Sequence, residues 1–427
     1  MTTKVDPPNT DGGTMYQIDN PEQFANNMLR LFEESGKVMS GYLDRADTTM
    51  SPYSTATEMT EASKTVADIV GLWMADPPRL MEAQGVLAKS YLEVWNHTVR
   101  RMMGDNPEPV IDPEPGDNRF KDPEWSSNPY FDFWKQSYLI TQQWTQDMLA
   151  HTDGLDESER RRAEYYFRLY MSAFSPSNFP MTNQEVVRET LRSNANNLVK
   201  GMESLSHDME NSGDLLKISQ TDLEAFEVGR NLATTPGKVV FQNDIFQLIQ
   251  YAPSTDTVNE IPLMIVPPWI NKFYILDLTP PKSLIKYAVD QGHTVFVISW
   301  VNPDTSLAGV RFEDYLHQGV LEAADAVRRE TGQPKVNGVG YCVGGTLLAT
   351  TLAYSAATNE DIFNTVTFLT TQVDFQKAGD LLLFIDDSQL NALDDVMNER
   401  GYLDGSRMAN VFNMMRPRDL IWPYIVN

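Results

Sequence analysis

The sequence holds a single cysteine, Cys342, and this scarcity excludes an internal disulfide bond. Its first residues, MTTKVDPPNTDGG, lack the basic and then apolar pattern of a secretory signal. These two features predict a reducing, cytoplasmic compartment. No apolar run reaches the roughly 18 residues needed for a membrane-spanning helix, so no transmembrane segment is predicted.

Basic residues are scarce as well. The 427 residues include 34 Lys and Arg against 59 Asp and Glu, which gives a formal net charge of −25. A chain of this charge repels a phosphate backbone, which argues against a nucleic-acid partner. The acidity is typical of a soluble surface, and an anionic substrate would need a local basic patch to bind against it.

The first half of the chain has helical patterning. Residues 1–19 are polar and contain Pro and Gly, which predicts disorder. A helical region is predicted over residues 20–214. Its first helix begins with Asn20 as the N-cap and Pro21 as the first helical residue.

Two stretches inside this helical region have a composition of their own. Residues at about 104–118 contain four prolines between 107 and 115 and are predicted to form a linker or an extended strap. The apolar stripe within residues 58–103 is typical of a helix–helix seam, although its methionines also suit a lipid- or partner-binding face. Farther on, Thr182 and Glu185 have the spacing of a capping box for another helix.

Strand and helix patterns alternate in residues 215–373. The predicted strands are 238–241, 246–251, 263–266, 295–298, 335–341 and 366–369, and the predicted helices are 282–290, 312–329 and 344–357. The first two strands have the pattern of an antiparallel entry pair. The others lack a polar–apolar alternation, which is typical of strands buried on both faces, with the helices as crossovers. This region is therefore predicted to be an α/β core with a mostly parallel sheet, and residues 374–427 a cap over it.

The string Gly338–Thr346 surrounds the cysteine at the point where a strand ends and a helix begins. A nucleophile on such an elbow has a strained backbone, and small residues two before and two after it allow neighbouring segments to approach. Gly340 and Gly344 occupy those positions. The pattern predicts an α/β-hydrolase-type elbow with Cys342 as its nucleophile. The alternative is that Cys342 is a small buried hydrophobic residue.

A thiol at this position favours acyl transfer over simple hydrolysis, because a thioester keeps the acyl group activated. The developing oxyanion needs donors, and the backbone N–H of Val343 at the start of the helix is the first candidate. The second donor is expected from the loop 267–272. Prolines have no N–H, so Trp269 or Ile270 is the candidate there, unless this loop is a simple turn.

The sequence resembles the single-subunit (class I type) polyhydroxyalkanoate synthases. The blocks that carry the resemblance are 128–131, 175–180, 234–240, 267–278, 291–296, 299–304, 338–346 and 414–422. They run from about residue 115 to the end of the chain.

The resemblance implies a function and partners. The family polymerises 3-hydroxyacyl-coenzyme A into polyester and releases coenzyme A, through an elbow cysteine, an aspartate and a histidine base. It implies that Cys342 holds the growing acyl chain and that the coenzyme A thioester is a substrate, with no cofactor or metal required. It also implies a homodimer and attachment to the polyester granule surface through residues 1–214, and it matches the predicted cap to the family's cap insertion.

One departure from the family pattern is clear. The acid and then the histidine follow the nucleophile in this fold, yet the five histidines, His97, His151, His207, His293 and His317, all precede Cys342. We therefore expect an incomplete core and a chain that stops within its cap, before the acid and base. Asp374 is not expected to act as the acid. The alternatives are a non-catalytic fragment that binds granules or an intact subunit, and a cysteine-type hydrolase.

Overall fold

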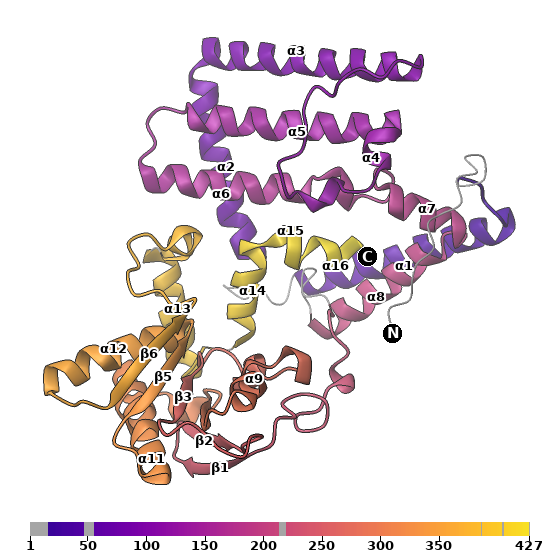
Figure 1. The fold of residues 1–427 in the computed structure, drawn as a ribbon. Coiled ribbons are helices and arrows are strands. Elements are labelled where there is room, and N and C mark those ends of the chain that lie inside the picture. Colours follow the sequence, from indigo (N-terminus) through magenta and orange to yellow (C-terminus); the bar gives the residue numbers. More distant parts are fainter. Residues whose placement is uncertain (1–15, 47–54, 213–218, 386, 404, 427) are drawn as a thin grey trace. The chain divides into compact units, whose positions relative to one another are not determined.

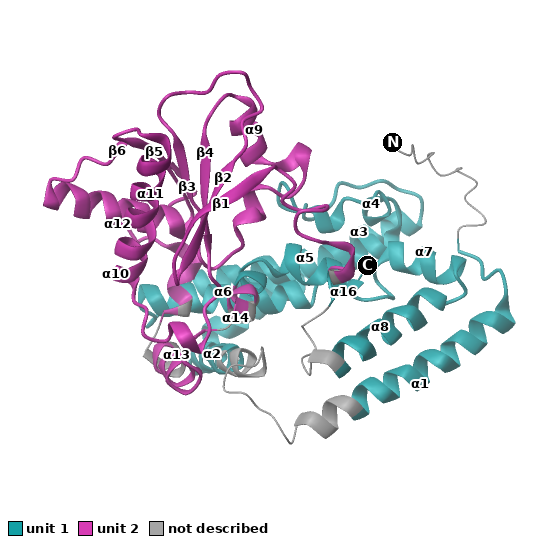
Figure 2. Cartoon of the chain, turned by 90° about the horizontal axis from the view of Figure 1, so that it is seen from below, with its two compact units in different colours: residues 1–220, 412–427 teal, residues 221–411 magenta. Residues whose placement is uncertain are grey.

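The computed structural model describes residues 16–46, 55–212, 219–385, 387–403 and 405–426 (Figure 1). The chain forms two compact units, residues 1–220 with 412–427, and residues 221–411 (Figure 2). The predicted boundary between 214 and 215 lies outside the described residues, as do residues 1–15. The segment predicted as one cap, 374–427, is divided between the two units.

The first unit is helical. Its helices are α1 (Pro21–Ala46), α2 (Thr55–Ala75), α3 (Pro77–Met102), α4 (Glu124–Ser127), α5 (Pro129–Ala150), α6 (Glu157–Ala173), α7 (Gln184–Arg192), α8 (Asn196–Ser212), α15 (Pro417–Leu420) and α16 (Trp422–Val426), with short 3₁₀ turns η1 (Asn118–Phe120) and η2 (Pro176–Asn178). Within this unit α3, α5 and α6 lie in layers, and α1 pairs with α8 (Figure 1).

The helix caps test two of the sequence predictions. Asn20 accepts a hydrogen bond from the backbone N–H of Gln23 (3.1 Å), so the N-cap predicted for α1 is confirmed. The capping box predicted at Thr182 is wrong. Asn183 caps α7 through two backbone N–H groups, and the Thr182 hydroxyl donates instead to a carbonyl of the preceding turn. Asn183 directly precedes the first helical residue, so its side-chain oxygen can accept hydrogen bonds from the free N–H groups of the first turn, which Thr182 is one residue too early to do.

A buried cluster of charges lies between α3 and α5. Asp132 is 2% exposed and contacts Lys135 (2.9 Å), Arg101 (2.8 Å) and His97 (3.0 Å). Burial alone would raise the pKa of Asp132. The hydrogen bond and charge of Lys135, with further hydrogen bonds from Arg101 and His97, bring this pKa below its usual value. The carboxylate is therefore the shared counter-ion of the two helices.

The proline-rich segment predicted as a linker or strap is tied to α5. The side-chain oxygen of Gln136 accepts hydrogen bonds from the backbone N–H groups of Val110 (2.6 Å) and Ile111 (3.4 Å). The amide nitrogen of Gln136 in turn donates to Asp132 (2.9 Å). This part of the chain is therefore a strap that is fixed to the helical layer.

The second unit is built on a six-stranded sheet of order β1-β2-β4-β3-β5-β6. The strands are β1 (Gly237–Gln242), β2 (Phe246–Tyr251), β3 (Leu263–Val266), β4 (Val295–Trp300), β5 (Val336–Tyr341) and β6 (Phe363–Leu369). The pairs β1–β2 and β2–β4 are antiparallel, and the other pairs are parallel. The antiparallel entry pair and the parallel core predicted from the sequence are confirmed.

The helices of this unit are α9 (Leu284–Asp290), α10 (Phe312–Asp314), the π-helix η7 (Tyr315–Leu321), α11 (Glu322–Thr331), α12 (Val343–Thr358), α13 (Asp387–Arg400) and most of α14 (Gly405–Met415). The short 3₁₀ turns are η3 (Leu223–Ala225), η4 (Phe273–Leu276), η5 (Pro280–Lys282), η6 (Thr305–Leu307) and η8 (Gly379–Phe384).

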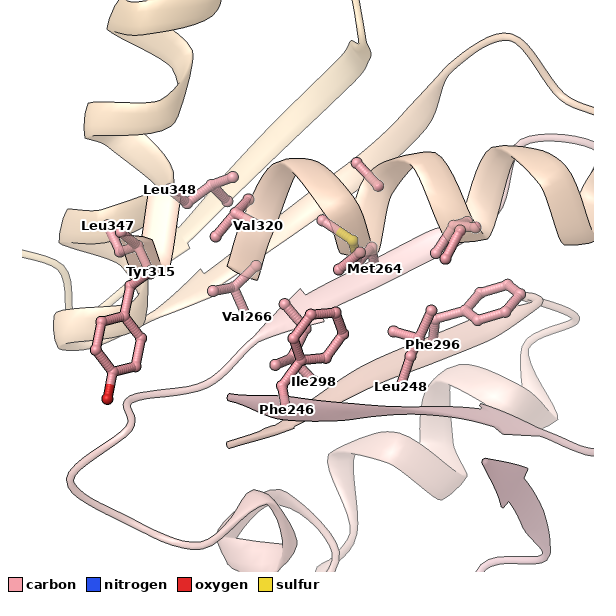
Figure 3. Close-up of a cluster of buried hydrophobic side chains, with 14 of the residues drawn as sticks. Phe246, Leu248, Met264, Val266, Phe296, Ile298, Tyr315, Val320, Leu347 and Leu348 are labelled. Carbon is pink, nitrogen blue, oxygen red and sulfur yellow. The ribbon is translucent and has the colours of Figure 1, made fainter. Parts of the chain in front are cut away.

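Helices cover both faces of the sheet. Side chains of β4 alternate, so that Phe296 and Ile298 pack against η7, α11 and α12, whereas Val297 packs against α9. Figure 3 shows Val320 of η7 and Leu348 of α12 in the same buried cluster as Phe296 and Ile298. The predicted fold class, an α/β-hydrolase-type sheet with a helical N-terminal region, is confirmed.

Candidate active site

Cys342 lies between the end of β5 and the start of α12. Its backbone has φ 53° and ψ −127°, a conformation that residues with a side chain rarely adopt. The backbone N–H of Cys342 donates to the carbonyl of Leu369 on β6 (2.9 Å), and its carbonyl accepts from the N–H of Gly345 (2.9 Å). Hydrogen bonds on both sides thus hold the partly exposed cysteine in this strained conformation.

Two glycines allow the elbow to contact its neighbours. A Cβ on Gly340 would overlap the backbone of Gly345, and a Cβ on Gly344 would overlap the carbonyl oxygens of Val266 and Pro267. The close approach predicted at both glycines is confirmed. Because of the second approach, the loop after β3 lies directly against the start of α12.

This arrangement brings the predicted oxyanion donors into one region. In the part of the chain that the structure describes, the N–H groups of Val343, Trp269 and Ile270 have no hydrogen-bond acceptor. Trp269 and Ile270 are the central residues of a turn in which the N–H of Asn271 donates to the carbonyl of Pro268 (3.3 Å). The loop is therefore a turn, and it also presents two unoccupied donors.

Aromatic side chains fix this turn. The ring of Trp269 stacks on Tyr315 of η7 (centroids 5.1 Å apart, planes at 29°) and meets Phe312 edge-on (6.0 Å). Tyr315 also meets Trp300 at the end of β4 (5.3 Å), and the indole nitrogen of Trp300 donates to the carbonyl of Pro267 (2.7 Å). Together these contacts fix the ring of Trp269 within the turn and the backbone of Pro267 directly before it.

Asp277 anchors the other end of the same loop. It is 1% exposed, and its Oδ1 accepts hydrogen bonds from the hydroxyls of Thr235 and Ser283 (2.6 Å each). Among the described residues, its Oδ2 and the hydroxyl of buried Tyr251 have no hydrogen-bond partner. Burial, and then the charge of Asp277, raise the pKa of Tyr251, so this phenol stays neutral.

The two histidines of this unit contact residues other than Cys342. His317 meets the ring of Tyr354 edge-on (4.8 Å), and His293 contacts an asparagine of the loop before β3 (3.3 Å). No hydrogen bond joins either histidine to Cys342 within the described ranges. Asp374 is exposed and accepts from a backbone N–H in its own turn (3.0 Å). Among the described residues, the site thus has a cysteine on a strained elbow and free backbone donors, and no histidine–acid pair is hydrogen-bonded to Cys342.

Within the described ranges, no group of three or more His, Cys, Asp or Glu side chains is placed to hold a metal ion. In those ranges, no helix combines the length and the apolar character that crossing a bilayer requires.

The sequence reasoning missed the segment after β6. Thr370 has a positive φ of 48°, and the hydroxyl of Thr346 on α12 donates to the carbonyl of Gln372 (2.7 Å). A Cβ on Gly345 would overlap the side chain of Thr371. The second glycine of the Gly344–Gly345 pair was a signal for this contact, since it is also a position where no side chain fits.

Comparison with known proteins gives consistent matches. Residues 116–288 match the family model described as poly-beta-hydroxybutyrate polymerase (PhaC) N-terminus. The chain is 52% identical over 372 residues to the poly(3-hydroxyalkanoate) polymerase of Methylorubrum extorquens, covering 87% of this chain and 62% of that protein. It is 47% identical over 412 residues to the polymerase subunit PhaC of Rhizobium meliloti (strain 1021), covering 96% and 67%. For the subunit PhaC of Cupriavidus necator the values are 41% over 316 residues, 73% and 53%. The chain thus spans between about half and two thirds of the length of these relatives.

Proposed function

Because the chain belongs to the poly(3-hydroxyalkanoate) polymerase family, we propose that it takes part in polymerising 3-hydroxyacyl-coenzyme A, with Cys342 as the residue that carries the acyl group. The observation that supports this most is the backbone of Cys342, a strained elbow packed through Gly344 against a loop with free N–H donors. A cysteine held only for packing would not need this conformation.

The first step is acylation of the thiol. The thiolate sulfur of Cys342 attacks the thioester carbonyl carbon, a new carbon–sulfur bond forms, and the carbonyl oxygen becomes an oxyanion. The N–H of Val343, together with that of Trp269 or Ile270, stabilises this charge. The intermediate then collapses, the bond to the coenzyme A sulfur breaks, and coenzyme A leaves as a thiolate that takes a proton from water. The acyl group remains on Cys342 as a thioester.

The second step is transfer to a hydroxyl group. The 3-hydroxyl oxygen of another acyl unit attacks the Cys342 thioester, an ester bond forms, and the thiolate is restored. The proton of that hydroxyl needs a base. None of the described residues is placed as one, so we expect acylation by this chain to be far faster than repeated transfer. Removing one member of such a triad typically lowers the rate by about 10⁴ or more.

The other partners implied by the resemblance stay predictions. These are attachment to the polyester granule surface and assembly as a homodimer. The expectation that no cofactor is required also stays a prediction, and in it the coenzyme A thioester is the substrate.

The test is to incubate the chain with 3-hydroxybutyryl-coenzyme A and to measure the intact mass together with released coenzyme A. We expect one hydroxybutyryl adduct, located on the peptide that contains Cys342, and none in the Cys342→Ala variant. Equal release of coenzyme A from both proteins would overturn the proposal. Release of free hydroxybutyrate from wild type at the rate of coenzyme A release would instead favour the hydrolase alternative.

A further inference from the structure

The helical unit contains a small cavity that carries positive charge in an acidic chain. Its volume is about 180 Å³, and it is lined by the second half of α6 and by residues 414–419. Helix α15 lies beside α6 within this unit (Figure 1). The charged residues among those described in the lining are Arg168, Arg416, Arg418 and Asp419. We call this site the arginine cavity, and the charge of its lining is +2, whereas the whole chain has −25.

The half-buried side chain of Arg418 is available to a ligand. In the part of the chain that the structure describes, it makes no ion pair and no hydrogen bond. The neighbouring carboxylate of Asp117 is already held by Arg119 through both oxygens (2.9 and 2.6 Å). Burial alone would raise the pKa of Asp117, and the hydrogen bonds and charge of Arg119, followed by the charge of Arg418, lower it. Arg418 therefore lies near one carboxylate without being bound to it.

The other two arginines make contacts that a ligand can share. Arg416 forms an ion pair with Asp419 (2.7 Å), but the two side chains are 72% and 54% exposed, so the pair is weak. Arg168 lies over the ring of Tyr165, 5.6 Å from its centroid, and this ring also lines the cavity. A guanidinium has five N–H donors, so it can bind an anion while it keeps such contacts.

Ser172 adds a hydroxyl group to the wall of the arginine cavity. It lies one helical turn after Arg168 on α6 and is 1% exposed. A serine inside a helix often donates to the carbonyl four residues before it, whereas the Ser172 hydroxyl has no hydrogen-bond partner among the described residues. An unpaired buried hydroxyl costs free energy, so a bound acceptor at this place would be favourable.

We propose that the arginine cavity binds one phosphate group, either as free phosphate or as the monoester of a small molecule. Arginine matches phosphate oxygens well, and a phosphate monoester has three acceptor oxygens and a charge of about −1.5 to −2 at pH 7. This charge balances the +2 of the lining, whereas a carboxylate supplies one negative charge and two oxygens.

The size of the cavity agrees with a single group. Its volume of about 180 Å³ is smaller than the roughly 300 Å³ at which sites for drug-sized ligands begin, so it fits a phosphate and not a whole nucleotide. The site lies within the helical unit and does not depend on the activity proposed for Cys342.

Isothermal titration calorimetry of the full chain with sodium phosphate tests the site. We expect binding at one site per chain, weakened about tenfold or more in Arg416→Gln and in Arg418→Gln, the effect of losing one charge-assisted hydrogen bond. Arg192→Gln is the matched control, because Arg192 is exposed and paired with an acid three residues away, as Arg416 is, but does not line the cavity. Equal weakening by Arg192→Gln would reveal a general charge effect and overturn the proposal.

A second variant separates binding from damage to the fold. Asp419→Asn removes the acid that competes with the ligand for Arg416, so it is expected to tighten phosphate binding by up to about fivefold, the worth of an exposed ion pair. A damaged fold would not bind more tightly. The proposal is overturned by a lack of phosphate binding, by acetate binding as tight as that of phosphate, or by unchanged binding in Arg418→Gln with a native circular dichroism spectrum.

Coenzyme A and dephospho-coenzyme A identify the source of the phosphate, because they differ only in the 3′-phosphate monoester. Competition with phosphate by coenzyme A alone would identify this monoester as the ligand, and competition by neither would leave free phosphate as the ligand. Equal competition by both would show that a monoester is not what the site recognises and would overturn the proposal. Cys342→Ala is expected to bind phosphate as wild type does, so this site and the proposed acylation are tested independently.

Discussion

Gly344 lies so close to Pro267 that a Cβ on the glycine would stand 2.5 Å from the proline carbonyl oxygen. The two residues come from α12 and from the loop after β3, and 77 positions separate them in sequence. Their contact joins the helix that follows Cys342 to the loop that holds the second proposed oxyanion donor. The distance between the two proposed donors is therefore set by one glycine.

Replacing Gly344 by alanine is expected to separate this loop from α12. We expect the free energy of unfolding to fall by about 2 kcal/mol, in the range of overpacked cores. The rate of Cys342 acylation is expected to fall by about 10²-fold, since one oxyanion donor is displaced. Denaturant unfolding and mass spectrometry measure the two effects.

The matched control is Gly201→Ala on α8, where nothing lies within 4 Å of the added Cβ. This change is expected to raise the free energy of unfolding by up to about 1 kcal/mol and to leave acylation unchanged. If Gly344→Ala behaves like Gly201→Ala, the close approach has no functional role.

Trp300→Phe tests the hydrogen bond that holds Pro267. Trp300 is 9% exposed, and its substitution leaves the buried carbonyl of Pro267 without a donor. We expect a loss of about 1 to 3 kcal/mol in the free energy of unfolding and slower acylation. Trp134→Phe, at a residue that is 41% exposed, is the control and is expected to change neither quantity. Equal stability of the two variants would argue against the anchor.

The buried carboxylate of Asp132 is expected to make the free energy of unfolding fall at acidic pH. Its pKa is lower in the folded chain than its usual value of 3.8, so its contribution is complete above that value and is lost as the pH falls through the folded pKa. Asp132→Asn leaves Lys135 and Arg101 without their shared counter-ion and is expected to cost about 3 to 5 kcal/mol at neutral pH.

Urea unfolding from neutral pH to about pH 3 measures this effect, and the difference between wild type and Asp132→Asn is expected to shrink in the acid. Asp153→Asn is the control, because that side chain is 95% exposed, and it is expected to change stability by less than about 1 kcal/mol. A constant difference between wild type and Asp132→Asn at every pH would contradict the assignment.

The buried phenol of Tyr251 is expected to make the free energy of unfolding fall at alkaline pH. Its pKa is raised in the folded chain above its usual value of 10.0, so its contribution is present below that value and is lost as the pH rises toward the folded pKa. Tyr251→Phe removes a buried hydroxyl without a partner and is expected to be near neutral at pH 7. Above about pH 10 it is expected to retain more stability than wild type. Thermal unfolding at several alkaline pH values checks this against Tyr287→Phe, whose side chain is 62% exposed.

The sequence predicted the sheet well because its signals are local. β3 occupies Leu263–Val266, the range expected from its apolar run. β6 begins at Phe363, three residues before the predicted start, because pairing with β5 continues past the apolar residues. The elbow was found for the same reason, since Gly340, Cys342 and Gly344 lie within five residues of sequence.

Features that depend on distant contacts were not predicted. The π-helix η7 has an ordinary helical pattern, and its position depends on Gly319, where a Cβ would stand 2.8 Å from the ring of Trp300. The division of 374–427 also depends on such contacts, because the hydroxyl of Tyr165 donates to the carbonyl of Met414 (3.1 Å) from the helical unit. No local sequence pattern in residues 374–427 predicts that hydrogen bond.

The positive φ of Cys342 affects which residue is most stable at this position. Any side chain in this conformation costs about 1 to 3 kcal/mol, whereas glycine adopts it freely. The fold would therefore be more stable with Cys342→Gly than with the thiol. Selection for stability alone would therefore favour glycine at this position, and a cysteine that is kept there at a cost in stability is consistent with the role that we propose for its thiol.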